Sequence, residues 1–305
     1  MSKFTFFLPM IGVWVLIAAG CGVVKTDDDS LINDQSPTPE PLSCPFNRPS
    51  HVAALDDGGL VMVNHAGLSM CIFDAALHTQ AVVLLQQAPS AVAVIGDAIV
   101  LANPKLGGLD RYSKDGVFLG RMAQDAGWPS AIVVAPDLGR VFIGDGNSYR
   151  VLVYDLDGNQ ISAFGSPGDG PGQFYRPADL AWDAGRGLLF LADYENQRVQ
   201  VFDGQGNYVR ELRTFDTDPQ DLIRPVALAV HPNGTLFVLD SLWSGVYVFD
   251  SDGSFNRIFG NFGRGPKGMR NPSGMRFIEP DFNVLAIADW QNNRLKLFTT
   301  DGGAP

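Results

Sequence analysis

Two residue types that commonly build catalytic and metal sites are scarce in this chain of 305 residues, which has 3 cysteines and 4 histidines. No two histidines have the short spacing of a zinc motif. The chain also lacks a Gly-x-Ser-x-Gly sequence and any Cys–His arrangement that would suggest a nucleophile. The motifs therefore predict no metal, no cofactor and no catalytic residue.

Basic residues are also few: 22 Lys and Arg stand against 33 Asp and Glu, which gives a net charge of -11. Binding to nucleic acid requires clustered Lys and Arg to neutralise phosphates, so nucleic acid is not an expected partner. Charged residues make up only 18% of the chain, whereas there are 34 glycines and 20 prolines. This composition is typical of a turn-rich β protein.

What the chain does have is a repeat marked by prolines. The spacings between successive members are 40, 40, 48, 48 and 47 residues, and the six positions are Pro49, Pro89, Pro129, Pro177, Pro225 and Pro272. After each proline come short apolar runs separated by turn residues, which predicts β-strands. In the copy that opens at Pro177 the expected strands are Asp179–Trp182, Leu188–Ala192, Val199–Phe202 and Tyr208–Leu212. Six such repeats predict an all-β, six-bladed propeller with four antiparallel strands per blade over residues 44–305; an open solenoid is the alternative.

The segment FGSPGDGPGQFYRPADLAW, followed by LFLADYENQRVQVFD, closely resembles the NHL repeat. The resemblance covers roughly residues 46–305 and is strongest in the blades that open at Pro129, Pro177 and Pro272. It implies a six-bladed propeller and a binding or scaffolding role. Among NHL-like propellers is the peptidyl-hydroxyglycine amidating lyase, whose zinc-binding histidines have no matching residues here.

The N-terminus resembles a bacterial lipoprotein signal. Lys3 precedes an apolar run from Phe4 to Ala19, and Cys21 follows. This run is shorter than the ~20 residues that span a membrane, so residues 1–21 are expected to be a signal with lipidation at Cys21. An ordinary secretory signal and a retained anchor are the alternatives. Residues 22–43 form an acidic, proline-containing tether, and the expected location is the cell envelope, as an outer-membrane lipoprotein facing the periplasm or the surface.

Two features are expected to be architectural. The pairs Asp145/Arg150, Asp193/Arg198 and Asp289/Arg294 recur across the second-to-third strand loop, where they can bridge its ends. Once Cys21 is lipidated, Cys44 and Cys71 remain and are expected to form a disulfide, with Cys71 at an outward-facing position; two separate thiols are the alternative. Residues 41–48 are expected to pair with Leu295–Thr299 as the missing strand of blade six.

The central channel is expected to contain His51, Asp179 and Arg276. His51 and Asp179 occupy the same place in blades one and four, which lie opposite each other in a six-bladed ring, and Arg276 lies two residues deeper in blade six. Solvated channel residues are one interpretation, and a metal or catalytic site is the other.

The binding surface is expected on the face formed by the second-to-third strand loops and the inter-blade connections. Exposed aromatic residues there would form a recognition site, namely Trp128, Tyr149, Phe174, Tyr175, Tyr194, Trp243 and Trp290. Arg48, Arg176 and Arg224 precede the repeat prolines and would ring the channel mouth, which favours an anionic group on a protein, peptide or glycan ligand. The alternative is packing of these residues between blades. The predicted function is a lipid-anchored binding scaffold, with a propeller lyase or lactonase-type hydrolase as the alternative.

Overall fold

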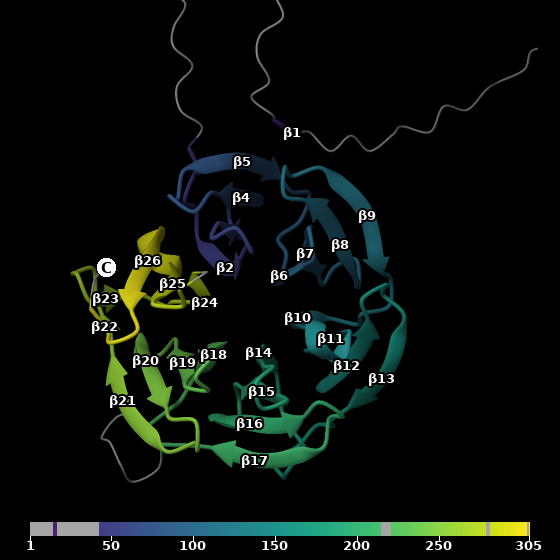
Figure 1. Cartoon of the computed structure of the whole chain (residues 1–305), viewed down its shortest axis with the longest axis vertical. Helices are drawn as coiled ribbons and strands as arrows, with labels where there is room; N and C mark the ends of the chain where they lie inside the picture. The colour runs from purple at the N-terminus through teal and green to yellow at the C-terminus, as the bar shows by residue number, and fades with distance from the viewer. Residues whose placement is uncertain (1–14, 17–42, 215–220, 279–280, 304) are drawn as a thin grey trace, which may run out of the picture.

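The computed structural model describes residues 15–16, 43–214, 221–278, 281–303 and 305. These residues form six antiparallel sheets arranged in a ring around a central channel (Figure 1). No α-helix occurs among them, and the two helical turns are the 3₁₀ helices η1 (Pro136–Leu138) and η2 (Trp290–Asn292). The six-bladed propeller predicted from the proline repeat is therefore confirmed.

Each blade runs from an inner strand at the channel to an outer strand at the rim. Blades one and two contain β2 (Pro49–Ala54), β3 (Leu60–Asn64), β4 (Ser69–Phe73), β5 (Thr79–Leu84), β6 (Ala91–Ile95), β7 (Ala98–Asn103), β8 (Gly108–Ser113) and β9 (Phe118–Ala123). Blades three and four contain β10 (Pro129–Ala135), β11 (Arg140–Asp145), β12 (Arg150–Asp155), β13 (Gln160–Phe164), β14 (Pro177–Asp183), β15 (Leu188–Asp193), β16 (Arg198–Asp203) and β17 (Tyr208–Leu212). Blades five and six contain β18 (Pro225–Val230), β19 (Leu236–Asp240), β20 (Gly245–Phe249), β21 (Phe255–Phe259), β24 (Gly274–Ile278), β25 (Val284–Asp289) and β26 (Arg294–Thr299); β22 (Asn261–Phe262) and β23 (Gly268–Met269) lie in the connection between them.

The repeat proline marks the start of the inner strand in blades one, three, four and five. Proline has no backbone N–H to donate, so the first residue of a strand is one of the few places in a sheet that tolerates it. In those four blades the register shifts by a bulge immediately after the proline. The bulge turns the next residues, and this sets which side chains face the channel.

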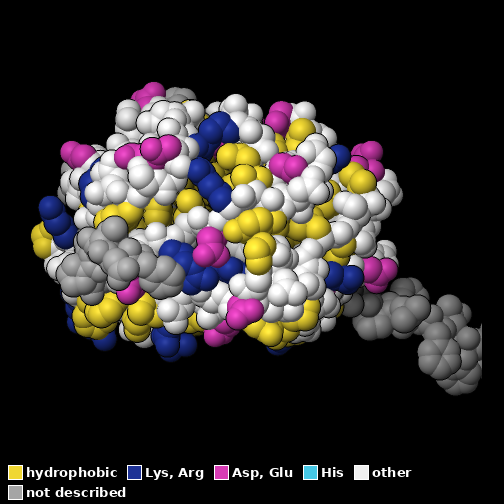
Figure 2. All heavy atoms as spheres, turned by 90° about the horizontal axis from the view of Figure 1, so that it is seen from below, with side chains coloured by type: hydrophobic (Ala, Val, Ile, Leu, Met, Phe, Trp, Pro, Cys, Tyr) yellow, Lys and Arg dark blue, Asp and Glu magenta, His cyan; other side chains and the backbone are white. Residues whose placement is uncertain are grey.

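The ring is held together by apolar packing between neighbouring blades. Six buried clusters lie one at each junction, including the junction between blades one and six. The second strand of a blade, such as β15, is apolar on both faces and almost entirely buried, because a blade packs on both sides. On the outer wall, apolar, basic and acidic side chains are interspersed on the face seen in Figure 2.

Blade six differs from the others because it has three strands among the described residues. The predicted pairing of residues 41–48 with Leu295–Thr299 is wrong for the described part, 43–48, which forms no strand until Pro49. Cys44 is bonded to Cys71 of blade one, and this bond holds the segment on that blade. The segment nevertheless lies against blade six, since Cys44 shares a cluster with Leu295 and Leu297.

The predicted signal and tether lie almost entirely outside the described residues. The exceptions are Ser43 and the two-residue strand β1 (Val15–Leu16), which pairs with β5. Within the described ranges, no helix has the length and apolar character needed to cross a membrane.

Candidate functional site

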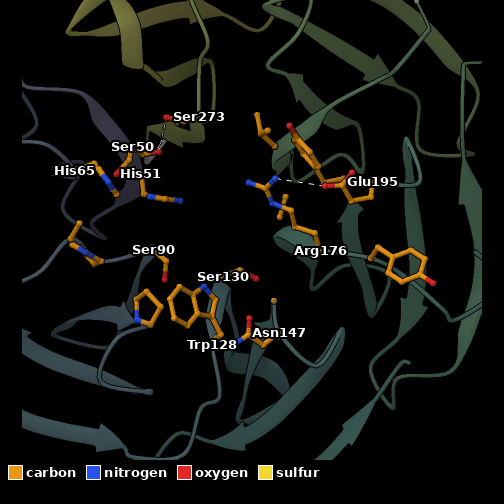
Figure 3. A pocket seen from close by; sticks show the side chains of 18 of the residues that line it. Ser50, His51, His65, Ser90, Trp128, Ser130, Asn147, Arg176, Glu195 and Ser273 are labelled. Carbon is orange, nitrogen blue, oxygen red and sulfur yellow. Dashed lines mark hydrogen bonds and ion pairs between the residues drawn. The ribbon is translucent and has the colours of Figure 1, made fainter. Parts of the chain in front are cut away.

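The upper chamber is a cavity of about 690 Å³ at the mouth of the central channel (Figure 3). We define it by the residues that line it, which come from the start of each inner strand, the second-to-third strand loops and the inter-blade connections. Its volume falls within the ~300–1,000 Å³ that is usual for small-ligand sites. The face chosen from the sequence therefore contains a cavity of a size suited to a small ligand.

In blades three to six the second strand ends in an aspartate, and this aspartate holds the rim of the chamber. Asp145 Oδ1 accepts a hydrogen bond from the Trp128 amide at 3.1 Å, and Asp193 Oδ1 accepts one from Tyr175 at 3.0 Å. Asp240 holds the amide of Arg224 in the same way, at 2.7 Å. Burial opposes ionisation of Asp145, yet its hydrogen bonds, that from Trp128 first, outweigh burial and lower its pKa. The rim backbone is thus fixed before any ligand binds.

The same aspartates form the predicted loop bridges. The Arg side-chain nitrogen lies 3.3 Å from Asp145, 2.9 Å from Asp193 and 2.8 Å from Asp289, and the partners are Arg150, Arg198 and Arg294. These pairs sit beside the chamber rather than in it. The bridges across the second-to-third strand loop, expected from the five-residue spacing, are confirmed.

Most of the predicted aromatic residues line the chamber: Trp128, Tyr149, Tyr175, Tyr194 and Trp290. Two of the predicted aromatics do not. Trp243 lies outside the lining, and its indole Nε1 donates to the Asp221 carbonyl at 3.1 Å. Phe174 was expected to be exposed but is fully buried between blades three and four, so this expectation is wrong.

One of the three predicted arginines reaches the chamber. Arg176 lies 4.3 Å above the ring of Tyr194, and its Nη1 is 3.8 Å from Glu195. Arg48 and Arg224 are not among the lining residues. The predicted ring of three arginines is therefore absent from the described lining, and the acid Glu195 stands beside the one arginine that is present.

Sequence reasoning missed a set of serines. The residue after the repeat proline is serine in four of the six blades, and all four line the chamber: Ser50, Ser90, Ser130 and Ser273. Three of their hydroxyls donate to the next blade, as when Ser130 Oγ bonds the Pro177 carbonyl at 2.6 Å and Ser273 Oγ bonds the Ser50 carbonyl at 3.0 Å. The signal was present in the sequence as a Pro-Ser dipeptide repeated at the blade period.

The floor of the chamber brings together the three predicted channel residues. Arg276 binds Asp179 through two hydrogen bonds, of 2.8 and 3.0 Å, and Asp179 also accepts from the Leu228 amide at 2.8 Å. Burial opposes the charge of Arg276, but the Asp179 carboxylate outweighs it and raises the Arg276 pKa. His51 points into the chamber from blade one (Figure 3), and all three residues line one small cavity at its base.

His51 is neutral at physiological pH. Desolvation lowers its pKa to about 4, despite the opposing effect of the Asp179 charge. Its Nδ1 is buried and has no hydrogen-bond partner among the described residues. Below this floor lies a separate apolar pocket of about 170 Å³, so the channel is divided into two chambers.

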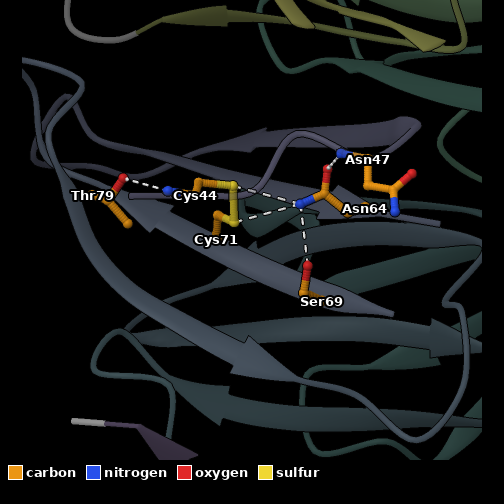
Figure 4. Close-up of a disulfide and its surroundings, with 6 residues drawn as sticks. All are labelled: Cys44, Asn47, Asn64, Ser69, Cys71 and Thr79. Atoms are coloured by element: carbon orange, nitrogen blue, oxygen red, sulfur yellow. Dashed lines mark hydrogen bonds between the residues drawn. A yellow bond between two sulfur atoms is a disulfide. The ribbon is translucent and has the colours of Figure 1, made fainter. Parts of the chain in front are cut away.

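The predicted disulfide is present in the structure (Figure 4). Cys44 and Cys71 are joined, with their Cα atoms 5.9 Å apart. The expectation that Cys71 is exposed is wrong: its exposed fraction is 0%, because the segment that contains Cys44 covers it. Asn64 Nδ2 lies 3.5 Å from each sulfur, and Asn64 Oδ1 accepts from the Asn47 amide at 3.2 Å. The disulfide therefore fixes the chain that enters blade one.

No group of three or more His, Cys, Asp or Glu residues in the described ranges is arranged to hold a metal ion. His51 and Asp179 are near each other, but Asp179 forms a salt bridge with Arg276. The site offers aromatic faces, hydroxyls and one Arg–Glu pair, which are groups suited to binding.

Comparison with known proteins supports the fold. A family model described as 6-bladed beta-propeller matches residues 129–224. No curated protein matches this chain. Among solved structures, a streptogramin B lyase has a TM-score of 0.61 at 16% identity, covering 86% of this chain and 83% of that one. A chain of a nidogen/laminin complex has a TM-score of 0.64 at 16% identity, covering 77% of this chain and 86% of that one. Virginiamycin B lyase from Staphylococcus aureus has a TM-score of 0.59 at 13% identity, covering 84% and 83%. These likenesses show that the chain is a six-bladed β-propeller.

Proposed function

We propose that this protein is a lipid-anchored, NHL-type propeller of the bacterial cell envelope that binds a ligand in the upper chamber and serves as a binding scaffold. The observation that carries the proposal is the chamber itself. Its aromatic side chains are exposed: Trp128 is 43% exposed and Tyr175 is 39% exposed. The backbone that carries them is already fixed by the hydrogen bonds from the amides of these two residues to Asp145 and Asp193. Preorganised, exposed aromatic residues at a cavity are typical of recognition sites.

The binding role is tested by fluorescence titration of the full-length protein with defined panels of peptides and oligosaccharides. Trp128 and Trp290 line the chamber, so a bound ligand is expected to change the emission. Because the double variant Trp128→Ala/Trp290→Ala removes both reporter rings, its binding is measured by calorimetric titration; the response should be abolished while the melting temperature stays close to that of the parent. Trp243→Phe is the matched control, because Trp243 is exposed on the same face but outside the chamber. A response that survives the double variant would refute the proposal.

The anchor is a separate part of the proposal and is supported by the sequence alone: an apolar run that ends before Cys21, then an acidic tether. We propose that the propeller is an outer-membrane lipoprotein facing the periplasm or the surface. Mass spectrometry of the mature N-terminus should find an acylated cysteine at position 21, and Cys21→Ser should move the protein into the soluble fraction. An N-terminus that begins elsewhere without acyl groups would refute it.

An enzyme is the second candidate, favoured by His51. A neutral histidine with a buried, unpartnered Nδ1 at the floor of a chamber is available as a proton acceptor, and two of the similar structures are named lyases. The reaction class would be a lyase or a lactonase-type hydrolase. Incubation with quinupristin and with a simple lactone tests it: turnover that is lost in His51→Ala would favour the enzyme, and absence of turnover with both would remove it.

A further inference from the structure

The charges of the upper chamber cancel locally. In its described lining the Arg and Glu side chains are Arg176 and Glu195, which lie 3.8 Å apart, and the two histidines are His51 and His65. His51, with a pKa of about 4, adds no charge at neutral pH. At the floor, Arg276 and Asp179 are bound to each other through two hydrogen bonds. A ligand with a net charge would therefore meet no opposite charge that is free to pair with it.

The polar tips of the chamber's aromatic residues form no hydrogen bond with any residue that the structure describes. In the described part of the chain, no hydrogen bond engages the hydroxyl groups of Tyr149, Tyr175 and Tyr194 or the indole nitrogens of Trp128 and Trp290. The other two described tryptophans behave differently. Trp182 Nε1 donates to Asp137 Oδ1 at 2.7 Å, and Trp243 Nε1 donates to the Asp221 carbonyl. Among the described residues, indole and phenol groups without a hydrogen bond thus gather at the chamber, whereas the indole nitrogens of Trp182 and Trp243 are hydrogen-bonded.

These groups are arranged on different sides of the cavity. Trp128 and Tyr175 precede the inner strands of blades three and four, whereas Trp290 comes from blade six, where its ring lies 5.1 Å from that of His65. Tyr149 and Tyr175 meet edge to face at 5.3 Å. A ligand in the chamber would meet apolar ring faces together with indole and phenol groups that are free to form hydrogen bonds. A molecule that matches both has C–H groups for stacking and hydroxyl groups for hydrogen bonding.

We infer that the upper chamber binds a short, electrically neutral oligosaccharide, an inference that rests on the proposed binding function. A pyranose ring has C–H groups on its faces for stacking on indole and hydroxyls at its edge for hydrogen bonding. The cavity of about 690 Å³ is large enough for more than one such ring. This replaces the expectation of an anionic ligand, because Arg48 and Arg224 lie outside the lining and Glu195 offsets Arg176.

Glu195 has a specific part in this inference. Its carboxylate stands beside the guanidinium that an acidic ligand would otherwise use, so it acts against anions. The variant Glu195→Gln removes the negative charge and keeps the size of the side chain. We expect this variant to gain affinity for an acidic oligosaccharide by about tenfold, while its affinity for a neutral one changes little.

The test is calorimetric titration of the full-length protein with maltohexaose, cellohexaose and N-acetylchitohexaose as neutral probes, hexagalacturonate as the anionic probe and hexa-alanine as the peptide probe. At least one neutral probe should bind, with an affinity nearly independent of salt. Trp128→Ala and Trp290→Ala should each weaken it by about tenfold. The control Trp243→Phe should not change it.

Three results would overturn the inference. Preferential binding of hexagalacturonate by the parent, weakening steeply with salt, would assign the chamber to anions. Binding of hexa-alanine alone would assign it to peptides. In both cases the binding function stands if the response depends on Trp128 and Trp290. Silence of all five probes would overturn the inference, and the proposed binding function falls as well if the wider panels are also silent.

Discussion

Replacing Asp179 with alanine is expected to destabilise the propeller, because it leaves the guanidinium of Arg276 in the channel without its counter-charge. The change removes two hydrogen bonds to Arg276, of 2.8 and 3.0 Å, and the one that Asp179 accepts from the Leu228 amide. Breaking one side of a buried pair typically costs about 3–5 kcal/mol. Since 24% of the Arg276 side chain is exposed, we expect a value near the lower end, about 3 kcal/mol.

The measurement is urea unfolding followed by far-ultraviolet circular dichroism, with the free energy of unfolding compared at constant m-value. The matched control is the double variant Asp179→Leu/Arg276→Met, which replaces both charges with apolar groups of similar size. Such replacement is often neutral or stabilising, so the double variant should recover most of the loss. With the single variants Asp179→Leu and Arg276→Met, which complete the double-mutant cycle, the coupling energy should be about 2 kcal/mol or more.

The reasoning would be refuted by an Asp179→Ala variant that loses less than about 1 kcal/mol, which is the range of an exposed pair. A double variant as unstable as the single one would also contradict it. That result would mean that the space occupied by the pair matters, and its charge does not.

Three further predictions concern other parts of the ring. Replacing Cys44 and Cys71, which are separated by 27 residues, with alanine should lower the free energy of unfolding by about 3–4 kcal/mol, measured by urea titration. The control is the parent protein after reduction of its disulfide, which should lose the same amount. His51 has a folded pKa of about 4 against an ordinary value of 6.5, so the unfolded state binds more protons between these values and stability should fall as pH falls from about 6.5 to 4, by up to about 3 kcal/mol; His51→Phe should lack this slope. Ser273→Ala should cost about 1 kcal/mol by removing the hydroxyl that bonds blade one, and a similar loss is expected for Ser130→Ala; a thermal melt unchanged by both would contradict this.

The fold could be predicted from the sequence because its signal is periodic. A proline every 40 to 48 residues, followed by alternating apolar residues, leaves few architectures possible. The positions of His51, Asp179 and Arg276 follow from the same period, since equivalent residues of a ring face the same channel. The structural features that recur in every blade can therefore be predicted from the sequence.

The residues that line the chamber were harder to predict, because the direction of a side chain at the rim depends on the local backbone conformation. Arg48 and Arg176 both precede a repeat proline and both have positive φ, of 52° and 55°, but only Arg176 lines the cavity. Its place depends on Tyr194 and Glu195, which belong to one blade and do not recur. The burial of Cys71 also could not be foreseen, because the segment that covers it is outside the repeat.

In blades three to six, the hydrogen bonds that the loop aspartates accept from the rim amides tie each rim residue to the second strand of its own blade. Asp145 ends the second strand of blade three, and Trp128, whose amide donates to it, directly precedes the first strand of that blade. Asp193 and Tyr175 are related in the same way in blade four. A blade therefore carries its own contribution to the chamber together with the clamp that orients it. Exchange of a single blade, from two residues before its proline, would therefore carry over one sector of the lining with the aspartate that orients it, provided that the hydrogen bonds and apolar packing to the neighbouring blades are kept.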